Sequence, residues 1–131
     1  MKKIIIVGSL NTDMVISAPY CPKGGETLTG KDFMVNCGGK GANQAVAAAK
    51  LGGNVLMCGC VGNDMFGNRL IENLAEAGSD TRFVRKVDGT PTGTAVILVT
   101  NGENRIVLDK GANARLSRED IDAVLNEACE G

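Results

Sequence analysis

A glycine-rich turn that leads into a small-residue helix is the part of this sequence best suited to chemistry. Residues 38–43 are Gly-Gly-Lys-Gly-Ala-Asn. The apolar residues that follow recur at helical spacing, and they share a face made of Ala42, Ala45, Val46 and Ala49. The N–H groups at the start of a helix lack intrahelical partners, and the helix dipole is positive there. The turn therefore predicts a site for a ligand rich in oxygen atoms, such as a phosphate or a polyhydroxylated sugar.

Two common nucleotide-binding patterns do not describe this turn. A P-loop places Ser or Thr after its Gly-Lys pair to hold magnesium, whereas Gly41 follows Lys40 here. The dinucleotide pattern G-x-G-x-x-G does not follow the first strand-like segment either. A glycine turn that enters a helix without any ligand remains the alternative interpretation.

Two short polar side chains follow the first apolar segment. Residues 4–7 are Ile-Ile-Ile-Val, which predicts a parallel strand buried on both faces. Ligands of open α/β sheets bind beyond the carboxyl ends of the strands, so Asn11 and Asp13 are expected at a binding site. A carboxylate accepts from two sugar hydroxyls, and an amide both donates and accepts. An ordinary Asx turn is the alternative for this pair.

Composition excludes several classes of function. The 14 basic and 15 acidic residues nearly cancel, so no basic field is available for nucleic acid or anionic lipid. The absence of histidine excludes Ser-His-Asp and Cys-His hydrolases and histidine-ligated metals. The five irregularly spaced cysteines favour reduced thiols, with Cys58 and Cys60 buried in a strand. No apolar segment is long enough for a signal peptide or a membrane span, which favours the cytoplasm.

Strand-like and helix-like segments alternate along the chain, which predicts an α/β sheet with right-handed crossovers. The expected parallel strands are residues 4–7, 55–60 and 82–87. The expected helices between them are residues 41–51 and about 64–77.

Four further segments alternate polar and apolar residues and predict a second layer of strands. They are residues 14–18, 27–35, 94–100 and 105–109, of which the last two form a hairpin with its turn at 101–104. A final helix is predicted to begin at Ser117, because the S-R-E-D run is typical of a capped helix start. Its expected buried face comprises Ile121, Val124, Leu125 and Ala128.

Five segments resemble the ribokinase-like family of phosphofructokinase-B-type sugar kinases. They are G-S-L-N-T-D-M (8–14), P-K-G-G-E-T (22–27), G-G-K-G-A-N-Q-A-V-A-A-A-K-L-G (38–52), G-C-V-G-N-D-M-F-G (59–67) and K-G-A-N-A-R-L-S (110–117). The resemblance extends along all 131 residues, and the segment at 38–52 is the most specific. The asparagine-x-aspartate pair and the late G-A-N motif favour the ribose-phosphorylating members of the family.

The resemblance implies an α/β fold in which a parallel sheet is flanked by helices and carries a small β-sheet lid. The lid segments would be about 14–35 and 94–109, inserted in the α/β core. Family members are more than twice this long, so residues 1–131 are expected to be an N-terminal, truncated part of the domain. The family's glycine-alanine-glycine-aspartate loop, which holds the catalytic base and lies beside the ATP site, is not in this sequence.

The function implied is ATP-dependent phosphorylation of a sugar, with the primary hydroxyl of D-ribose as the expected acceptor. No catalytic residue and no metal ligand is expected in this chain, which by itself is predicted to be inactive. ATP, Mg²⁺ and a monovalent cation would bind in the missing half, and the lid would form a homodimer. The implied sugar contacts are Asn11, Asp13, Gly39, Lys40 and Asn43, with Leu108 as a lid contact.

Other interpretations of the same residues stay open. A fructokinase, a nucleoside kinase, and a non-catalytic sugar-binding or interaction module are the alternatives for the whole chain. For single residues, Lys40 could be a solvated lysine, Asn43 a helix cap, and Asp13 a partner of Lys40.

Overall fold

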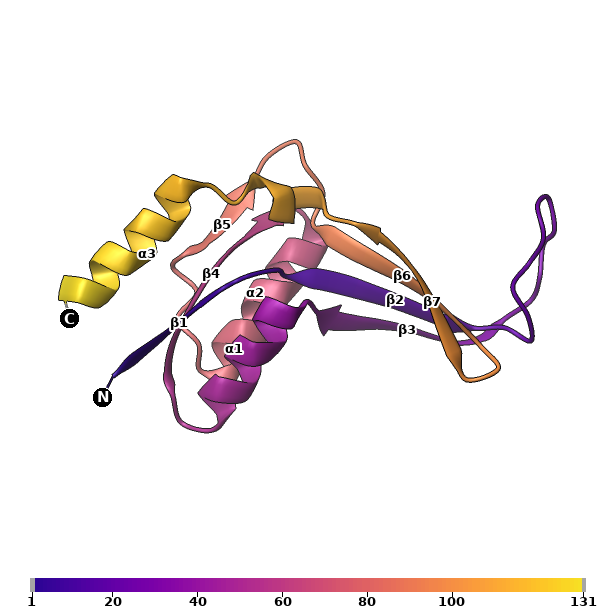
Figure 1. Cartoon of the computed structure of the whole chain (residues 1–131), viewed down its shortest axis with the longest axis horizontal. Coiled ribbons are helices and arrows are strands. Elements are labelled where there is room, and N and C mark those ends of the chain that lie inside the picture. The colour runs from indigo at the N-terminus through magenta and orange to yellow at the C-terminus, as the bar shows by residue number, and fades with distance from the viewer. Residues whose placement is uncertain (1, 131) are drawn as a thin grey trace.

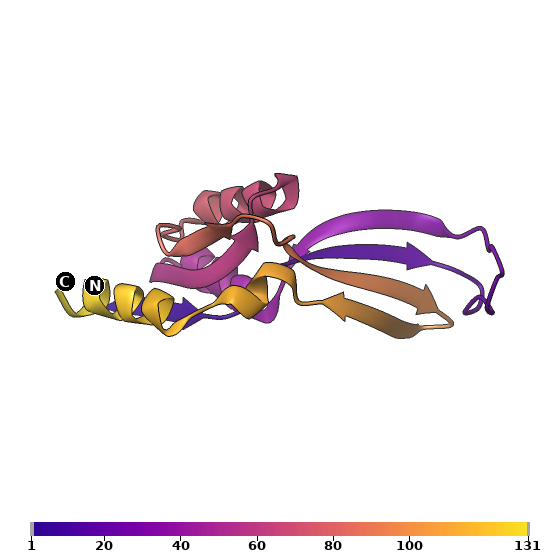
Figure 2. The same ribbon diagram turned by 90° about the horizontal axis from the view of Figure 1, so that it is seen from above.

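The computed structural model describes residues 2–130 and divides them between two sheets. The first is a parallel sheet of three strands in the order β1-β4-β5, with helices packed against it. The second has four strands in the order β3-β2-β6-β7 and extends away from the first (Figures 1 and 2). This arrangement confirms the predicted fold class, an α/β sheet with a separate lid-like sheet. We refer to the second sheet as the lid sheet.

The parallel sheet and its helices form the body of the molecule. Its strands are β1 (Lys3–Val7), β4 (Asn54–Gly62) and β5 (Val84–Val87). Its helices are α1 (Lys40–Lys50), α2 (Met65–Ala77), the 3₁₀ helix η1 (Gly111–Arg115) and α3 (Arg118–Glu130). Strand, helix and strand follow one another from β1 to β5, apart from the lid strands inserted between them. The three predicted parallel strands are therefore confirmed.

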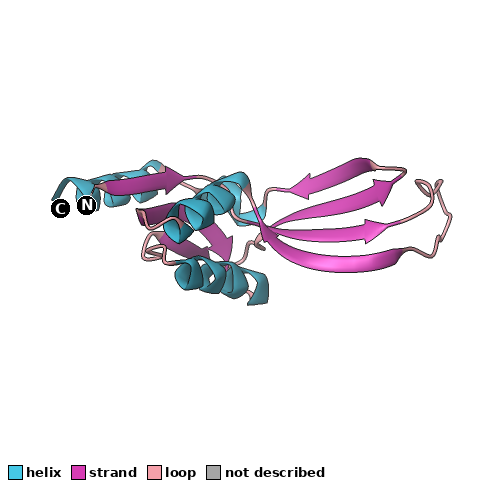
Figure 3. Ribbon diagram, turned by 90° about the horizontal axis from the view of Figure 1, so that it is seen from below, coloured by secondary structure: helices cyan, strands magenta, loops and turns pink. Residues whose placement is uncertain are grey.

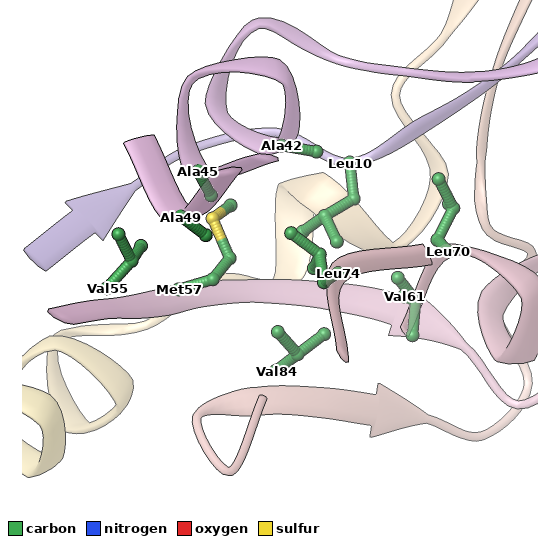
Figure 4. Packing of buried hydrophobic residues seen from close by; sticks show 10 residues of the cluster. All are labelled: Leu10, Ala42, Ala45, Ala49, Val55, Met57, Val61, Leu70, Leu74 and Val84. Atoms are coloured by element: carbon green, nitrogen blue, oxygen red, sulfur yellow. The ribbon is translucent and has the colours of Figure 1, made fainter. Parts of the chain in front are cut away.

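Two apolar clusters hold helices on opposite faces of the parallel sheet. On one face α1 and α2 pack over β4, and Figure 4 shows Ala45 of α1 and Leu74 of α2 meeting around Met57. All three side chains are fully buried. Because alanine is short, α1 lies close to the strands beneath it. On the other face Val124 of α3 packs against Cys58 of β4.

The lid sheet combines a parallel pair with two antiparallel ones. Its strands are β2 (Asn11–Ser17), β3 (Lys31–Gly38), β6 (Gly93–Thr100) and β7 (Glu103–Asp109). Strands β2 and β6 run parallel at the centre, and β3 and β7 flank them in antiparallel fashion (Figure 3). The predicted hairpin is confirmed, with a tighter turn, because only Asn101 and Gly102 connect β6 to β7. Their φ angles of 48° and 78° are those of a type I′ turn.

The burial predicted for the first strand is confirmed only in part, because Ile5 and Ile6 are half-buried against the two clusters while Ile4 and Val7 are exposed. Ile4 and Val7 are 41% and 42% exposed, because β1 lies at the edge of the parallel sheet and pairs with β4 alone in residues 2–130. Strand β4 occupies the centre of this sheet, and it is buried from Val55 to Gly62. Leu125 was predicted on the buried face of the last helix and is 46% exposed, because the contact of α3 with the sheet runs along Val124.

Several strand boundaries also differ from the predicted ones. The strand predicted at 27–35 instead runs from Lys31 to Gly38. These bounds follow from its partner β2, whose last residue Ser17 pairs with Lys31 and whose first residue Asn11 pairs with Gly38. The strand predicted at 14–18 begins three residues earlier, at Asn11. The strand predicted at 82–87 begins at Val84, after a turn.

The two sheets are joined by a compact set of hydrogen bonds around Asp64. This residue caps α2 by accepting from the Gly67 N–H at 2.8 Å, and it also accepts from the Thr92 hydroxyl at 2.6 Å and the Thr92 N–H at 3.0 Å. Burial opposes ionisation here, but these donors hold the pKa of Asp64 below its ordinary value. Because Thr92 immediately precedes β6, the cap ties the lid sheet to the body.

No helix described within residues 2–130 is long and apolar enough to cross a membrane. All five cysteines are free thiols, and the predicted burial of Cys58 and Cys60 is confirmed.

Candidate functional site

A cavity of about 660 Å³ lies where the base of the lid sheet meets the start of α1. Its lining comes from the β1–β2 connection, β2, the turn before α1, the end of β7, and η1. The lining residues are Ser9, Asn11, Asp13, Gly39, Lys40, Asn43, Leu108, Lys110, Asn113 and Ala114. The structure thus brings all six of the predicted site residues to one cavity, although their contact with a ligand stays a prediction.

Asp13 reaches the cavity from a strand rather than from a turn. It lies within β2, in a row across the lid sheet with Ala95 of β6 and Leu108 of β7. A side chain on Gly38 would collide with the Asp13 carboxylate, so the glycine makes room for it. Partial burial raises the pKa of Asp13 above its ordinary value. No ion pair with Lys40 is present in residues 2–130, so the cavity holds this carboxylate without a cationic partner.

The glycine turn takes a backbone conformation that other residues rarely adopt. Gly39 has a φ of 95°, and a Cβ there would stand 2.6 Å from the Ser9 carbonyl oxygen and 2.9 Å from the Asn11 nitrogen. The Ala42 N–H donates to the Ser9 oxygen at 3.0 Å, which fastens the first turn of α1 to the β1–β2 connection. The N–H groups of Lys40 and Gly41 have no intrahelical partner at this position.

The interpretation of Asn43 as a helix cap is wrong. Gly39 is the N-cap residue of α1 and makes no side-chain cap bond, while Asn43 sits one turn into the helix. Its backbone N–H donates to the Gly39 oxygen at 2.8 Å, and its side chain is left to line the cavity.

Asn113 is a cavity residue that the sequence analysis did not name as a contact. Its Oδ1 accepts from the Leu10 N–H at 2.9 Å, and its Nδ2 donates to the Leu10 oxygen at 3.1 Å and to Asn11 Oδ1 at 2.8 Å. It therefore joins η1 to the start of β2 across 103 residues of chain. The K-G-A-N segment that carries it was noted in the family resemblance, and this motif was the available signal.

Behind the cavity, Asp120 fixes the segment that contains Asn113. Its carboxylate accepts from Arg85 at 2.8 Å and from the Ser117 N–H at 2.9 Å, while Arg85 also donates to the Arg115 carbonyl at 2.9 Å. The Asp120 N–H donates back to the Ser117 hydroxyl at 3.3 Å, so the predicted capped start of the last helix is confirmed. The hydrogen bonds from Arg85 lower the pKa of Asp120 to about 2.

The cavity offers one carboxylate, three amides and two lysines, beside the glycine turn at which α1 begins. Hydroxyl groups both donate and accept, so a ligand with several hydroxyls could satisfy acceptors and donors of this kind together. Across residues 2–130 the structure has no group of three or more Asp, Glu, Cys or His side chains that could hold a metal ion. The arrangement is therefore suited to binding and orienting a polar ligand.

A larger cavity of about 820 Å³ lies between β3, α1 and α2. It shares Asn43 with the first cavity, and its charged residues Lys50, Arg69, Glu72 and Glu76 stand on exposed helix surface. Size alone does not make it the better candidate, because the glycine turn and the carboxylate of β2 face the smaller one.

Comparison with known proteins identifies relatives along the whole chain. Residues 1–130 match the family described as pfkB family carbohydrate kinase. The ribokinase of Haemophilus influenzae is 48% identical over 117 residues, which cover 88% of this chain and 38% of that protein. The deoxyribokinase of Salmonella typhi is 49% identical over 120 residues, covering 91% and 39%.

A solved structure of a ribokinase also matches this chain. Arabidopsis thaliana ribokinase complexed with ribose and ATP matches with a TM-score of 0.83 at 35% identity, over 92% of this chain and 41% of that one. The chain thus spans between 38% and 41% of the length of these three proteins, in each case with most of its own residues aligned.

Proposed function

This chain belongs to the pfkB family of carbohydrate kinases, and we propose that it forms the sugar-binding portion of an ATP-dependent ribokinase. The observation that carries the proposal is the convergence of Asn11, Asp13, Lys40 and Asn43 on one cavity beside the Gly39 turn. In the proposed reaction the γ-phosphoryl group of ATP moves to the primary hydroxyl of the sugar. Such transfer depends on positioning the acceptor and on stabilising the developing charge.

Each cavity residue has a separate task in this proposal. The Asp13 carboxylate accepts hydrogen bonds from two sugar hydroxyls, and Lys40 donates to a sugar oxygen. The absence of a side chain at Gly39 lets the sugar approach the helix N–H groups. Leu108 closes the lid side with an apolar surface, which limits the access of water to the transferred phosphoryl group.

ATP and its cations are assigned to residues beyond this chain. The Arabidopsis relative was solved with both ribose and ATP, and this chain covers 41% of it. The chain's part in the reaction is to hold and orient the acceptor hydroxyl, so the 131 residues alone are expected to show no turnover.

We further propose that the lid sheets of two copies contact each other in a homodimer. Val96 and Val107, which pair across β6 and β7 and so share one face of this sheet, expose 50% and 75% of their surface. Apolar side chains gathered on one exposed sheet are typical of a contact surface between proteins. We also propose a cytoplasmic location for the protein, because ATP is the expected phosphoryl donor.

The test is ADP release by the full-length protein with Mg-ATP and a set of sugars. We expect the highest kcat/KM with D-ribose and no turnover with 5-deoxyribose, which lacks the primary hydroxyl. Equal turnover with 5-deoxyribose would contradict phosphorylation at the primary hydroxyl. If none of the sugars were turned over, the proposed kinase activity would be contradicted.

2-Deoxyribose is the second candidate substrate. The deoxyribokinase relative is 49% identical and the ribokinase relative 48% identical, so overall similarity does not separate the two sugars. The same assay distinguishes them, because the preferred sugar has the higher kcat/KM under identical conditions.

A further inference from the structure

A short series of hydrogen bonds determines which end of the Asn11 amide faces the cavity. We propose that Asn113 is a positioning residue that turns Asn11 so that its NH₂ group, and not its oxygen, faces the bound ligand. The proposal rests on the function proposed above, because the ligand in question is the sugar. It assigns to Asn11 a donor role only, where the residue type alone allows both donor and acceptor.

The first step starts from the backbone of Leu10. A backbone N–H can only donate, so the Asn113 atom that stands 2.9 Å from the Leu10 nitrogen must be the oxygen Oδ1. The amide nitrogen of Asn113 then faces the Leu10 carbonyl oxygen, at 3.1 Å. The backbone of one residue thus fixes the orientation of the Asn113 side chain.

The second step passes this orientation to Asn11. The Asn113 nitrogen stands 2.8 Å from the Asn11 side chain, and an NH₂ group can only donate. The Asn11 atom at this position must therefore be Oδ1, and its own NH₂ group points away from Asn113. Both residues line the cavity, so these two donors are available to a ligand there.

The surroundings leave little freedom for another arrangement. A side chain on Gly93 would overlap both the Asn113 nitrogen and the Asn11 oxygen, so this glycine makes the space in which the two amides meet. The helix η1 is held by the Ala112 N–H, which donates to the Pro91 oxygen at 2.8 Å. Arg85 holds its far end through the Arg115 carbonyl at 2.9 Å.

The consequence is a division of labour along β2. Asn11 and Asp13 are two residues apart on one strand, and both line the cavity. The first presents donors and the second presents acceptors, so the sugar oxygen over Asn11 must accept while the hydroxyls over Asp13 donate. A ligand is thereby recognised by the direction of its hydrogen bonds as well as by its shape.

A double-mutant cycle tests whether Asn113 acts through Asn11. In Asn113→Asp one oxygen still accepts from the Leu10 N–H. The other oxygen stands against both the Leu10 carbonyl oxygen and Asn11 Oδ1, so Asn11 must turn its own oxygen to the ligand. We expect the Kd for ribose of the full-length protein, measured by calorimetry, to rise about tenfold, as for the loss of one hydrogen bond. In the Asn11→Ala background the same change should alter Kd less than twofold.

The matched control is Asn104→Asp, the same change of side chain on the exposed strand β7. It should leave Kd unchanged. Equal weakening by Asn113→Asp in both backgrounds would overturn the proposal, because Asn113 would then act on the sugar or the fold without Asn11.

A measurement on the unaltered protein tests the orientation without relying on any variant or on ribose. With ¹⁵N-labelled asparagine and no sugar present, both Asn113 side-chain protons should exchange slowly with water, and both Asn11 side-chain protons should exchange rapidly. Slow exchange of the Asn11 protons in the free protein would overturn the proposal. Absence of ribose binding in the calorimeter would instead contradict the proposed function and leave the orientation result standing.

Discussion

The two sheets of this molecule are stabilised in different ways. Strand β4, at the centre of the body, is buried from Val55 to Gly62, whereas every residue of β7 in the lid sheet is exposed. The body therefore depends on apolar burial, while the lid sheet depends mainly on its backbone ladder and on its attachment at Thr92. The candidate site lies where the two meet, with Asp13 on the lid sheet and Lys40 on the body. A ligand bound there should hold the two sheets together.

The largest expected contrast is in stability. Leu74 is fully buried in the body, and Val107 is 75% exposed on the lid sheet. Leu74→Ala should lower the free energy of unfolding by about 2–5 kcal/mol because it leaves a cavity, and Val107→Ala by about 0.5 kcal/mol or less. Urea unfolding followed by circular dichroism measures both. The small loss for Val107→Ala is expected of the dilute monomer, and in the proposed homodimer it should grow with protein concentration. A loss as large as that of Leu74→Ala in the dilute monomer would contradict the contrast.

Asp13 should dominate the affinity of the site. Hydrogen bonds to a charged group contribute about 1.5–3 kcal/mol each, so Asp13→Ala should cost about 2–4 kcal/mol, or roughly 30- to 1000-fold in ribose affinity. Calorimetric titration of the full-length protein provides the measurement. Asp122→Ala, an exposed aspartate on α3, is the control and should leave Kd unchanged. A change of less than threefold for Asp13→Ala would remove this carboxylate from the site.

A comparison of Gly39 with Gly52 separates the effect of a positive φ from the effect of steric crowding in the turn before α1. Gly39 and Gly52 have φ angles of 95° and 91°, but a Cβ at Gly39 would meet backbone atoms of residues 9–11 whereas one at Gly52 would meet nothing within 4 Å. Alanine at Gly52 should cost about 1–3 kcal/mol of stability through its positive φ, and alanine at Gly39 should cost more because the backbone of residues 9–11 must also shift. Only Gly39→Ala should also weaken ribose binding, by tenfold or more. Equal Kd values for the two variants would show that the turn does not approach the sugar.

Local patterns predicted the elements of the body, and together with the family resemblance they named six of the ten residues that line the cavity. The alanine spacing after Gly41 predicted α1, and residue type alone singled out Asn11 and Asp13 beyond the first strand. Helix periodicity and side-chain chemistry are local properties, so a single sequence carries them. The same patterns also separated the hairpin of the lid sheet from the parallel strands.

What the sequence did not predict depends on partners far away along the chain. The exposure of Ile4 follows from the edge position of β1, and no residue near it carries that information. The start of β2 at Asn11 follows from its pairing with Gly93, 82 residues later, and Gly38. Asn113 escaped notice for the same reason, because its partner Leu10 is 103 residues away.

The acidic residues of the two regions should respond to pH in opposite directions. In the body, hydrogen bonds from Arg85 lower the pKa of Asp120 to about 2, from an ordinary value of 3.8. A lowered pKa stabilises the fold at pH values above the ordinary one, and this contribution is lost as the pH falls from about 4 towards 2. Asp120→Asn should therefore cost on the order of 1–2 kcal/mol at pH 7 and flatten this part of the stability profile. Asp122→Asn on the same helix serves as the control, and equal profiles for the two variants would contradict the role of Arg85.

The smallest expected effect has the opposite sign and lies on the lid sheet. Burial raises the pKa of Asp13, so the folded state favours its protonated form. Its contribution to stability is present below the ordinary pKa and is lost as the pH rises through the folded value, which leaves an unfavourable charge at pH 7. Asp13→Asn should therefore raise the free energy of unfolding by a few tenths of a kcal/mol at pH 7 while it weakens ribose binding. Thermal unfolding with and without ribose checks both. A loss of stability in the absence of sugar would mean that the carboxylate is paired within the fold, and its place in the site would then be structural.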